Sequence, residues 1–283
     1  MKTYLDCYPC FLRQALSAAR RAGASTDQQR QILLDTMHEL RSLPSEATPP
    51  VMAEGINRLV RAHTSNPDPY REAKQEATQQ ALALIPGLME RVQKAVDPLE
   101  TAVRIAIAGN IIDYGVAESY ELDATLQRVL EQPFAIDDLP ALREALDRVD
   151  SVLYLADNAG ETVMDRVLIK AIDRPVTYVV KNGPIINDAT REDAHAAGLG
   201  EVAEIVDNGS DAPGTLLDRC SADFRRRFEQ ASLIIAKGQA NYETLSASEA
   251  PLFFLLQAKC AIIARDLGVT AGSTVVKGPR GRT

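Results

Sequence analysis

The chain has 283 residues, of which 46% are hydrophobic and 25% charged, a composition typical of a soluble globular protein with a sizeable core. Its formal net charge is −8, tryptophan is absent and aromatic residues make up 5%, which argues against nucleic-acid binding through clustered Lys and Arg or base stacking. No run of about 18 apolar residues is present and the first residues lack the apolar core of a signal peptide, so we expect a cytoplasmic protein with no membrane contact.

The first half of the chain has the pattern of a helical region. Apolar residues recur at helical spacing, and glycine or proline lies near most breaks in the pattern. Pro86 and Gly87 are expected to interrupt or kink the longest helix. The expected helices span residues 10–23, 25–40, 51–62, 71–95, 98–107, 123–132 and 137–148.

A different rhythm begins at Val152, where short apolar runs alternate with amphipathic segments. This alternation is typical of βα units and predicts a mainly parallel sheet. The expected strands span residues 152–156, 176–180, 202–206, 233–236, 252–256 and 274–276. We therefore expect an α/β protein with a helical region at residues 1–150 and an α/β domain at residues 151–283. Because no Gly/Ser-rich linker separates these parts, they should pack closely.

Polar residues follow four of the expected strands at the points where the strands end. The segments are Asp157–Glu161, Lys181–Thr190, Asp207–Asp211 and Lys237–Thr244. In a parallel sheet these ends lie on one edge, where ligands bind, so we expect the segments to converge on a site. For Asp207–Asp211 alone, a solvent turn or at most a lid is the favoured interpretation.

Three side chains at these strand ends are candidate ligands of a divalent cation, namely Asp157, Asn158 and Asp188. Two carboxylates and an amide oxygen would leave coordination positions open for water and a substrate phosphate. Such a cation could polarise a phosphoryl oxygen and lower the pKa of a bound water. Oxygen ligands favour Mg²⁺ or Mn²⁺, and Co²⁺ or Ni²⁺ could also bind. The same residues are explained equally well as caps of the helices that follow them.

Further polar residues and glycines are candidates for contact with the substrate. Lys237 could neutralise phosphate charge, and backbone N–H groups at the start of the helix after Gly160 suit an anion. A solvated surface lysine and an Asn/Asp turn between helices are the alternatives for Lys237 and for the segment 110–113. The candidate substrate-binding residues are Asn110, Asp113, Gly160, Glu161, Asn187, Lys237, Gly238, Asn241 and Glu243.

The pair Cys7 and Cys10 has the spacing of a zinc or redox motif. A structural zinc site needs four ligands, and Cys220 and Cys260 lie far away in sequence. A thioredoxin-like pair should follow a strand, whereas this pair opens the helical region. Structural or incidental roles are therefore favoured, and a composite metal or redox site stays open. No phosphate-binding glycine motif and no Ser-His-Asp set is recognisable.

Six motifs occur in a fixed order along almost the whole chain. They are Cys-x-x-Cys (7–10), Asn-Pro-Asp-Pro-Tyr (66–70), Gly-Asn-Ile-Ile-Asp (109–113), Asp-Asn-Ala-Gly-Glu (157–161), Gly-Pro-Ile-Ile-Asn-Asp-Ala-Thr (183–190) and Lys-Gly-Gln-Ala-Asn-Tyr-Glu-Thr-Leu (237–245). Together they resemble the DUF89 family, the damage-control phosphatases related to the ARMT1-like metal-binding domain. The cysteine pair is similar to that of its mainly prokaryotic branch.

This resemblance implies a helical N-terminal region on a Rossmann-like α/β domain, and metal-dependent phosphatase activity on small phosphorylated metabolites, including sugar phosphates and damaged ones. Lys237 resembles the family's lysine that contacts the substrate phosphate, and the segment 109–113 matches a motif that lines the cleft. The residues that correspond to the family's metal ligands are Asp157, Asn158 and Asp188.

The sequence thus predicts a metal-dependent phosphomonoester hydrolase whose catalytic residues are Asp157, Asp188 and Lys237. Direct attack by water is favoured over a phospho-enzyme on Asp157, because no Asp-x-Asp pair is present to supply a nucleophile and its acid. Two alternatives remain at this point: a non-catalytic metal- or metabolite-binding protein, and a redox or metal protein that uses the cysteine pair.

Overall fold

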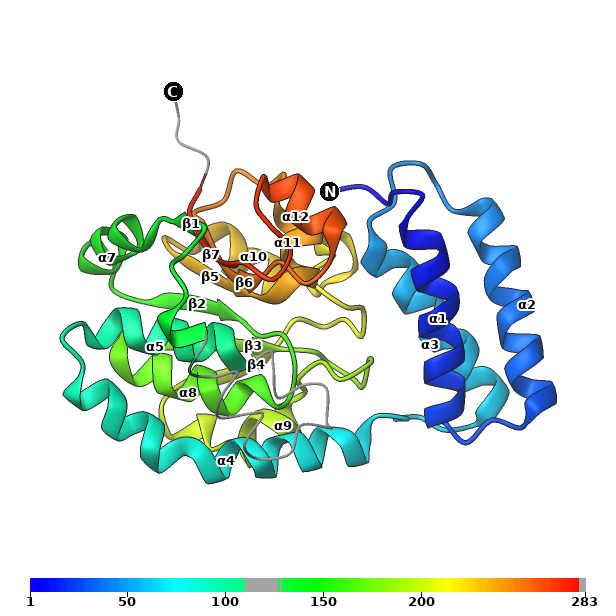
Figure 1. The fold of residues 1–283 in the computed structure, drawn as a ribbon, viewed down its shortest axis with the longest axis horizontal. Helices are drawn as coiled ribbons and strands as arrows, with labels where there is room; N and C mark the ends of the chain where they lie inside the picture. The colour runs from blue at the N-terminus through cyan, green and yellow to red at the C-terminus, as the bar shows by residue number, and fades with distance from the viewer. Residues whose placement is uncertain (110–126, 128, 280–283) are drawn as a thin grey trace.

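The computed structural model describes residues 1–109, 127 and 129–279, and the centre of the described part is a seven-stranded sheet (Figure 1). The strands are β1 (Ile136–Asp137), β2 (Val152–Leu155), β3 (Val176–Val180), β4 (Glu204–Asp207), β5 (Ile234–Lys237), β6 (Leu252–Gln257) and β7 (Thr274–Lys277). Their order in the sheet is β1-β7-β6-β5-β2-β3-β4. Neighbouring strands are parallel except β6 and β7, which are antiparallel. The prediction of a mainly parallel sheet is confirmed.

Helices precede the sheet in the chain and connect its strands. They are α1 (Cys7–Arg21), α2 (Thr26–Ser42), α3 (Pro49–Thr64), α4 (Arg71–Lys94), α5 (Pro98–Ala108), α7 (Leu139–Arg148), α8 (Glu161–Ala171), α9 (Arg191–Ala196), α10 (Ala222–Gln230), α11 (Gly238–Leu245) and α12 (Ala261–Leu267), with short 3-10 helices η2 (Leu199–Glu201) and η3 (Leu217–Arg219). Local sequence explains where several of these helices begin. A capping box joins Ser25 and Gln28 at α2, and proline occupies the first turn of α3, α5 and α7.

Alternate side chains of the central strands enter two different cores. Tyr154 of β2 and Tyr178 of β3 pack on one face of the sheet, which is covered by α4, α5, α7, α8 and α9. Leu153 and Leu155 of β2 pack on the other face, against α10, α11 and α12. Helices on both faces of a mainly parallel sheet make a three-layer α/β arrangement, which explains why the strands are nearly continuous apolar runs.

The first three helices form a bundle with its own core, which contains Phe11 of α1, Ile32 of α2 and Ile56 of α3. Figure 1 shows this bundle standing beside one edge of the sheet, with α4 running from it along the sheet. The division of the chain at residue 150 stays a prediction, and α4, α5 and α7 bury their apolar faces in the core of the sheet. Within the described part, no helix is long and apolar enough to cross a membrane.

The strand order creates a switch point between β2 and β5. From β2 the chain continues through β3 to β4 on one side, and then passes to β5 and β6 on the other side. In open α/β sheets, ligands bind outside the carboxyl ends of the strands at such a point, because the connections diverge there and leave a crevice. The residues that end β2 and β5 are therefore placed at the position where a site is expected.

Candidate active site

Two loops meet at the carboxyl end of β2 and bring the predicted metal ligands together. Asp157 and Asn158 follow β2, and Asp188 lies in the loop after β3. Ala189 N donates to Asp157 O over 2.9 Å, and Asn158 and Asp188 form an isolated antiparallel bridge. All three candidate ligands are buried. Residues separated by about 30 positions in sequence thus share one edge of the sheet.

Gly238, the first residue of α11, packs directly against Asp157. Its φ is +75°, and a Cβ atom built on it would lie 1.8 Å from Asp157 Oδ2. No side chain fits that space, and the left-handed backbone conformation itself favours glycine. The backbone at the end of β5 therefore lies directly against the Asp157 side chain and limits the positions that this side chain can take.

Hydrogen bonds orient the amide of Asn158. Its Nδ2 donates to Glu161 Oε1 over 2.9 Å and to Asp157 Oδ2 over 3.3 Å. Because both partners are carboxylates, the amide nitrogen must face them, which turns Asn158 Oδ1 away from them. Glu161, which is 1% exposed, thus acts on Asn158 by fixing which atom of its amide is presented as a ligand.

Lys237 is fully buried and bound by two carboxylates. Its Nζ lies 2.7 Å from Asp165 Oδ1 and 3.0 Å from Glu161 Oε2. Tyr154 Oη and Tyr178 Oη each donate to Asp165 over 2.7 Å. Burial alone would lower the pKa of Lys237, but the two carboxylates outweigh it and raise that pKa, so the ammonium stays charged. The alternative of a solvated surface lysine is therefore wrong.

Asp188 has a strained and incompletely satisfied environment. Its Oδ2 lies 3.5 Å from Lys181 Nζ, which also donates to Gly214 O, and it accepts no hydrogen bond within the described structure. Burial raises the pKa of Asp188 to about 6, although the Lys181 ammonium opposes the shift. Ile186 in the same loop has φ +45°, a costly conformation for a β-branched residue. A buried carboxylate oxygen without a hydrogen-bond donor is suited to a cation.

The charges of this cluster also suit a divalent cation. The cluster comprises four carboxylates and two ammonium groups, which together carry a formal charge of −2 when all are ionised: Asp157, Glu161, Asp165 and Asp188 with Lys181 and Lys237. Within the described ranges, no three His, Cys, Asp or Glu side chains are grouped to hold a metal. A cation here would depend on two carboxylates and an amide, with the remaining positions open to water and substrate, as magnesium and manganese sites commonly have.

The first turn of α8 is less open to an anion than the sequence suggests. Glu161 N donates to Asn158 O over 3.1 Å, and Thr162 N donates to Ala159 O over 3.2 Å. These two N–H groups are already used in the turn that leads into the helix. The positive end of the α8 dipole still points at the site, so the helix contributes a favourable field rather than these two hydrogen bonds.

Comparison with known proteins shows which family the chain belongs to. A family model described as the damage-control phosphatase ARMT1-like domain matches residues 3–275. The chain belongs to this family. This ARMT1-like chain is 37% identical to a damage-control phosphatase of Archaeoglobus fulgidus, with 98% of this chain and 99% of the relative covered. It is 34% identical to a damage-control phosphatase of Pyrococcus horikoshii, with 97% of each chain covered.

A solved structure agrees with this family. The crystal structure of a DUF89 family protein from Pyrococcus horikoshii matches with a TM-score of 0.90 and 33% identity, covering 99% of this chain and all of that one. The resemblance to the DUF89 family that the sequence motifs indicate is therefore confirmed. The assignment to the branch with a cysteine pair stays a prediction.

The other predicted site residues of this ARMT1-like chain have varied surroundings. Gly160 packs against Ala77 of α4, since a Cβ atom on it would lie 3.0 Å from Ala77 Cβ. Asn241 donates to Ala156 O and Lys237 O, which ties the ends of β2 and β5 together. Their substrate-binding roles stay predictions. The substrate-binding roles of Asn187 and Glu161 also stay predictions. Asn110 and Asp113 lie outside the described residues.

The Asn-Pro-Asp-Pro-Tyr motif of the family supports the loop that carries Asp188. Asn66 and Asp68 accept from backbone N–H groups two residues ahead and so shape the turn before α4. Lys74 of α4 then binds Asp68 Oδ2 over 3.3 Å and Asp193 Oδ2 over 3.1 Å. Asp193 in turn accepts from Thr190, two residues after Asp188. The motif is thus linked to the site through a buried ion pair.

Sequence reasoning missed Asp165 and Lys181 as members of the site. Asp165 lies four residues after Glu161 among apolar positions of α8, and a carboxylate on an apolar helix face is a signal for a buried ion pair. Lys181 follows β3 directly, as Lys237 ends β5. The segment 207–211 is also less exposed than a solvent turn: Asn208 and Ser210 are buried, and Arg61 of α3 binds Asp211 over 3.0 Å.

The cysteine pair opens α1, with Cys7 half-buried and Cys10 exposed, and the four cysteines are free. Burial raises the pKa of the Cys7 thiol, and Glu243, Cys260 and Cys10 add to the shift. Across the part of the chain that the structure describes, these thiols do not belong to a group of three metal ligands. A raised thiol pKa also disfavours the reactive thiolate, so the surroundings of Cys7 give little support to a redox role.

Proposed function

We propose that this chain is a metal-dependent phosphatase that removes the phosphoryl group from a small phosphorylated metabolite. The observation that carries the proposal is the meeting of Asp157, Asn158 and Asp188 at the β2/β5 switch point of an ARMT1-like chain. Relatives that share 34–37% identity over nearly the whole chain are named damage-control phosphatases, which supports the same reaction class here.

The chain's own residues prepare a site for a divalent cation and a phosphate. Asp157, Asn158 Oδ1 and Asp188 Oδ2, whose nearest cationic group is the Lys181 ammonium at 3.5 Å, would hold the cation. When bound, the cation supplies positive charge for the phosphoryl oxygens and makes a nearby water more acidic. The phosphate would lie at the edge of the sheet, where the α8 dipole and the cation both favour negative charge.

The two buried lysines limit the negative charge that a phosphate must approach. Lys237 pairs with both Glu161 and Asp165, and Lys181 lies beside Asp188, so the two ammonium groups offset part of the negative charge of the four carboxylates. Without them, four carboxylates would repel an anionic substrate. For Lys237 to contact the phosphate directly, as the family resemblance implies, its ammonium would have to exchange one carboxylate for a phosphoryl oxygen. We infer that its main contribution is charge compensation from beneath the site.

Phosphate release from a panel of sugar phosphates and phosphorylated cofactor fragments tests this function. Chelator-stripped protein would be assayed with Mg²⁺, Mn²⁺, Co²⁺ or Ni²⁺ added back, together with Asp157→Ala and Asp188→Asn. The exposed carboxylate variant Asp218→Asn is the matched control. We expect metal-restored turnover that falls by roughly a hundredfold or more in the two site variants and is unchanged in the control.

Two results would overturn the proposal. One is phosphate release by Asp157→Ala at the parental rate, although calorimetry shows that its metal binding is lost. The other is tight metal and metabolite binding by the parent without turnover on any member of the panel, which would indicate a binding protein instead. Circular dichroism of each variant separates loss of the site from loss of the fold.

A further inference from the structure

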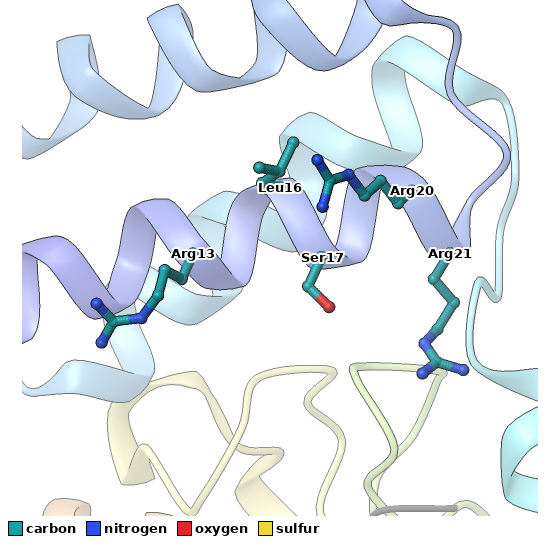
Figure 2. A pocket seen from close by; sticks show the side chains of 5 residues that line it. All are labelled: Arg13, Leu16, Ser17, Arg20 and Arg21. Atoms are coloured by element: carbon teal, nitrogen blue, oxygen red, sulfur yellow. The ribbon is translucent and has the colours of Figure 1, made fainter. Parts of the chain in front are cut away.

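One face of α1 is cationic and borders a cavity of about 580 Å³, lined by Arg13, Leu16, Ser17, Arg20 and Arg21. Arg13, Ser17 and Arg21 are spaced four residues apart and so lie along one side of the helix. Figure 2 shows these three side chains extending from α1 toward loops of the α/β part, whereas Arg20 and Leu16 lie on the other side of the ribbon. The cavity is thus bounded by a positively charged helix wall.

The charge of this wall is not neutralised by the protein. In the described structure, Arg13 makes no hydrogen bond or ion pair, and Arg21 contacts the ring of Tyr70, with 5.0 Å from its guanidinium carbon to the ring centroid. By contrast, Arg61 on α3 of the same bundle is paired with Asp211. In a chain with a net charge of −8, two exposed guanidinium groups facing a cavity without acidic partners favour an anionic ligand.

The same bundle is fixed to the loops that form the candidate active site. Arg61 Nη1 donates to Pro184 O over 3.2 Å, in the loop that leads to Asp188, and Arg61 Nη2 binds Asp211 over 3.0 Å. Tyr70, beneath Arg21, ends the turn that places Lys74 against Asp193. In Figure 1, α1 therefore stands on the side of the sheet to which the strand-end loops project. The wall therefore faces the loops of the α/β part to which Arg61 of the same bundle is bonded.

We propose that Arg13, Ser17 and Arg21 bind a second anionic group of the substrate, remote from the phosphoryl group that is removed. Guanidinium groups recognise phosphate and carboxylate by paired N–H donors, and the Ser17 hydroxyl adds one further donor. The substrate class is accordingly a small metabolite that carries a phosphate ester and a second phosphate or carboxylate. This inference rests on the proposed function, because it assigns the far end of the same substrate.

Matched substrates test the inference. Glucose 1-phosphate is compared with glucose 1,6-bisphosphate in one pair and with glucuronate 1-phosphate in the other, so that each pair keeps the same pyranose phosphate and differs in one added anionic group. KM and kcat are measured for the parent, the double variant Arg13→Ala/Arg21→Ala, and the control Arg30→Ala, which removes one exposed arginine from α2. For the bis-anionic substrate that the parent turns over more efficiently, the double variant should raise KM by roughly tenfold or more. The kcat for that substrate and the KM for its mono-anionic partner should be unchanged.

A binding measurement separates this inference from the phosphatase proposal. In chelator-stripped protein, calorimetry of glucose 1,6-bisphosphate should show weaker binding to the double variant than to the parent, by a similar factor, and no change in Arg30→Ala. Equal affinity of parent and double variant for both bis-anionic ligands overturns the arginine site, whether or not the protein releases phosphate. Equal losses on both members of a pair overturn it as well and leave the phosphatase proposal standing.

Discussion

At the scale of single residues, Gly238 decides where Asp157 can lie. A Cβ atom at this position would lie 1.8 Å from Asp157 Oδ2, whereas one at Gly23, which has a similar φ of +76°, would meet nothing within 4 Å. Substitutions at these two glycines therefore distinguish the cost of a positive φ, which both share, from a clash with Asp157, which only Gly238 would produce.

We predict that Gly238→Ala displaces Asp157 and weakens metal binding. Alanine at positive φ costs about 1 kcal/mol of unfolding free energy in both Gly238→Ala and Gly23→Ala. Only Gly238→Ala should also weaken metal affinity, by roughly a hundredfold, since a carboxylate ligand is moved. Urea unfolding and calorimetric metal titration measure the two effects, and equal metal affinity in both variants would contradict this account of the site.

Glu243 is a second residue whose buried environment should affect a measurable property, the dependence of stability on pH. Burial raises the pKa of its carboxyl to about 7 from an ordinary 4.5, although the hydrogen bond from Gln239 Nε2 opposes the shift. A raised pKa means that the folded state binds this proton more tightly than the unfolded chain does. Stability therefore falls as pH rises from about 4.5 to 7, and the loss persists at higher pH.

Glu243→Gln should remove this pH dependence and keep a partner for Gln239. We expect the variant to be more stable than the parent above pH 7, by up to about 3 kcal/mol, with the difference shrinking toward zero below pH 4.5. Urea unfolding midpoints between pH 4.5 and 8 measure this. A difference that is constant over that range would show that Glu243 does not titrate as its burial implies.

At the scale of elements, one buried network joins three strands and a helix. Tyr154 comes from β2, Tyr178 from β3 and Lys237 from β5, and all three bind Asp165 of α8. The network is fully satisfied, so the ion pair can exist without solvent. Because it joins the strands on both sides of the switch point, it holds the walls of the candidate site in register.

We predict that Asp165→Ala destabilises the protein by about 3–5 kcal/mol, because it leaves two tyrosine hydroxyls without an acceptor and Lys237 with one carboxylate. Adding Lys237→Met in the same chain should deepen the loss, because the buried Glu161 carboxylate then loses its ammonium partner. Urea unfolding of the single and double variants decides this. A double variant as stable as Asp165→Ala, or more stable, would show that the Lys237–Glu161 pair contributes nothing to stability once Asp165 is gone.

Most strands could be predicted from sequence, because strands buried on both faces are short apolar runs. Residues 176–180 were expected and observed, and the other predicted strands agree within two residues. β1 was missed, since its two residues are defined only by pairing with β7. The strand order and the antiparallel β7 were not predicted, because local sequence does not contain long-range pairing. α4 continues through Pro86, so the helix is not interrupted there, and the expected kink stays a prediction.

At the scale of the whole molecule, the approach of the strand ends was predictable but the burial of the site was not. Parallel strands place their carboxyl ends at one edge, so Asp157 and Asp188 were expected to converge and they do. The pairing of Lys237 with Asp165 depends on how α8 packs beneath the sheet. The periodicity of apolar residues does not predict that packing. Lys237, expected at the surface or in contact with a phosphate, is therefore found buried beneath the site.

The bundle of α1–α3 also depends on tertiary contacts, and Arg61 is one of the residues that join it to the α/β part, as Glu54 of α3 does through its ion pair with Arg219. Its two hydrogen bonds reach Pro184 O and Asp211 Oδ2, in the loops after β3 and β4. Because both partners of the ion pair are partly exposed, their contribution to unfolding free energy is small. Their effect should lie in the placement of the bundle over the site.

We therefore predict that Arg61→Ala lowers unfolding free energy by less than about 1 kcal/mol but speeds hydrogen exchange in the loop at residues 183–188. KM should rise severalfold and metal affinity should fall less than in Gly238→Ala, because the loosened loop carries Asp188 whereas Asp157 is not moved. Arg58→Ala is the matched control, since Arg58 on the same helix pairs with Glu39 inside the bundle at 4.0 Å. If both variants leave hydrogen exchange and KM at parental values, Arg61 does not determine the placement of the bundle, and other contacts such as the Glu54–Arg219 ion pair hold it.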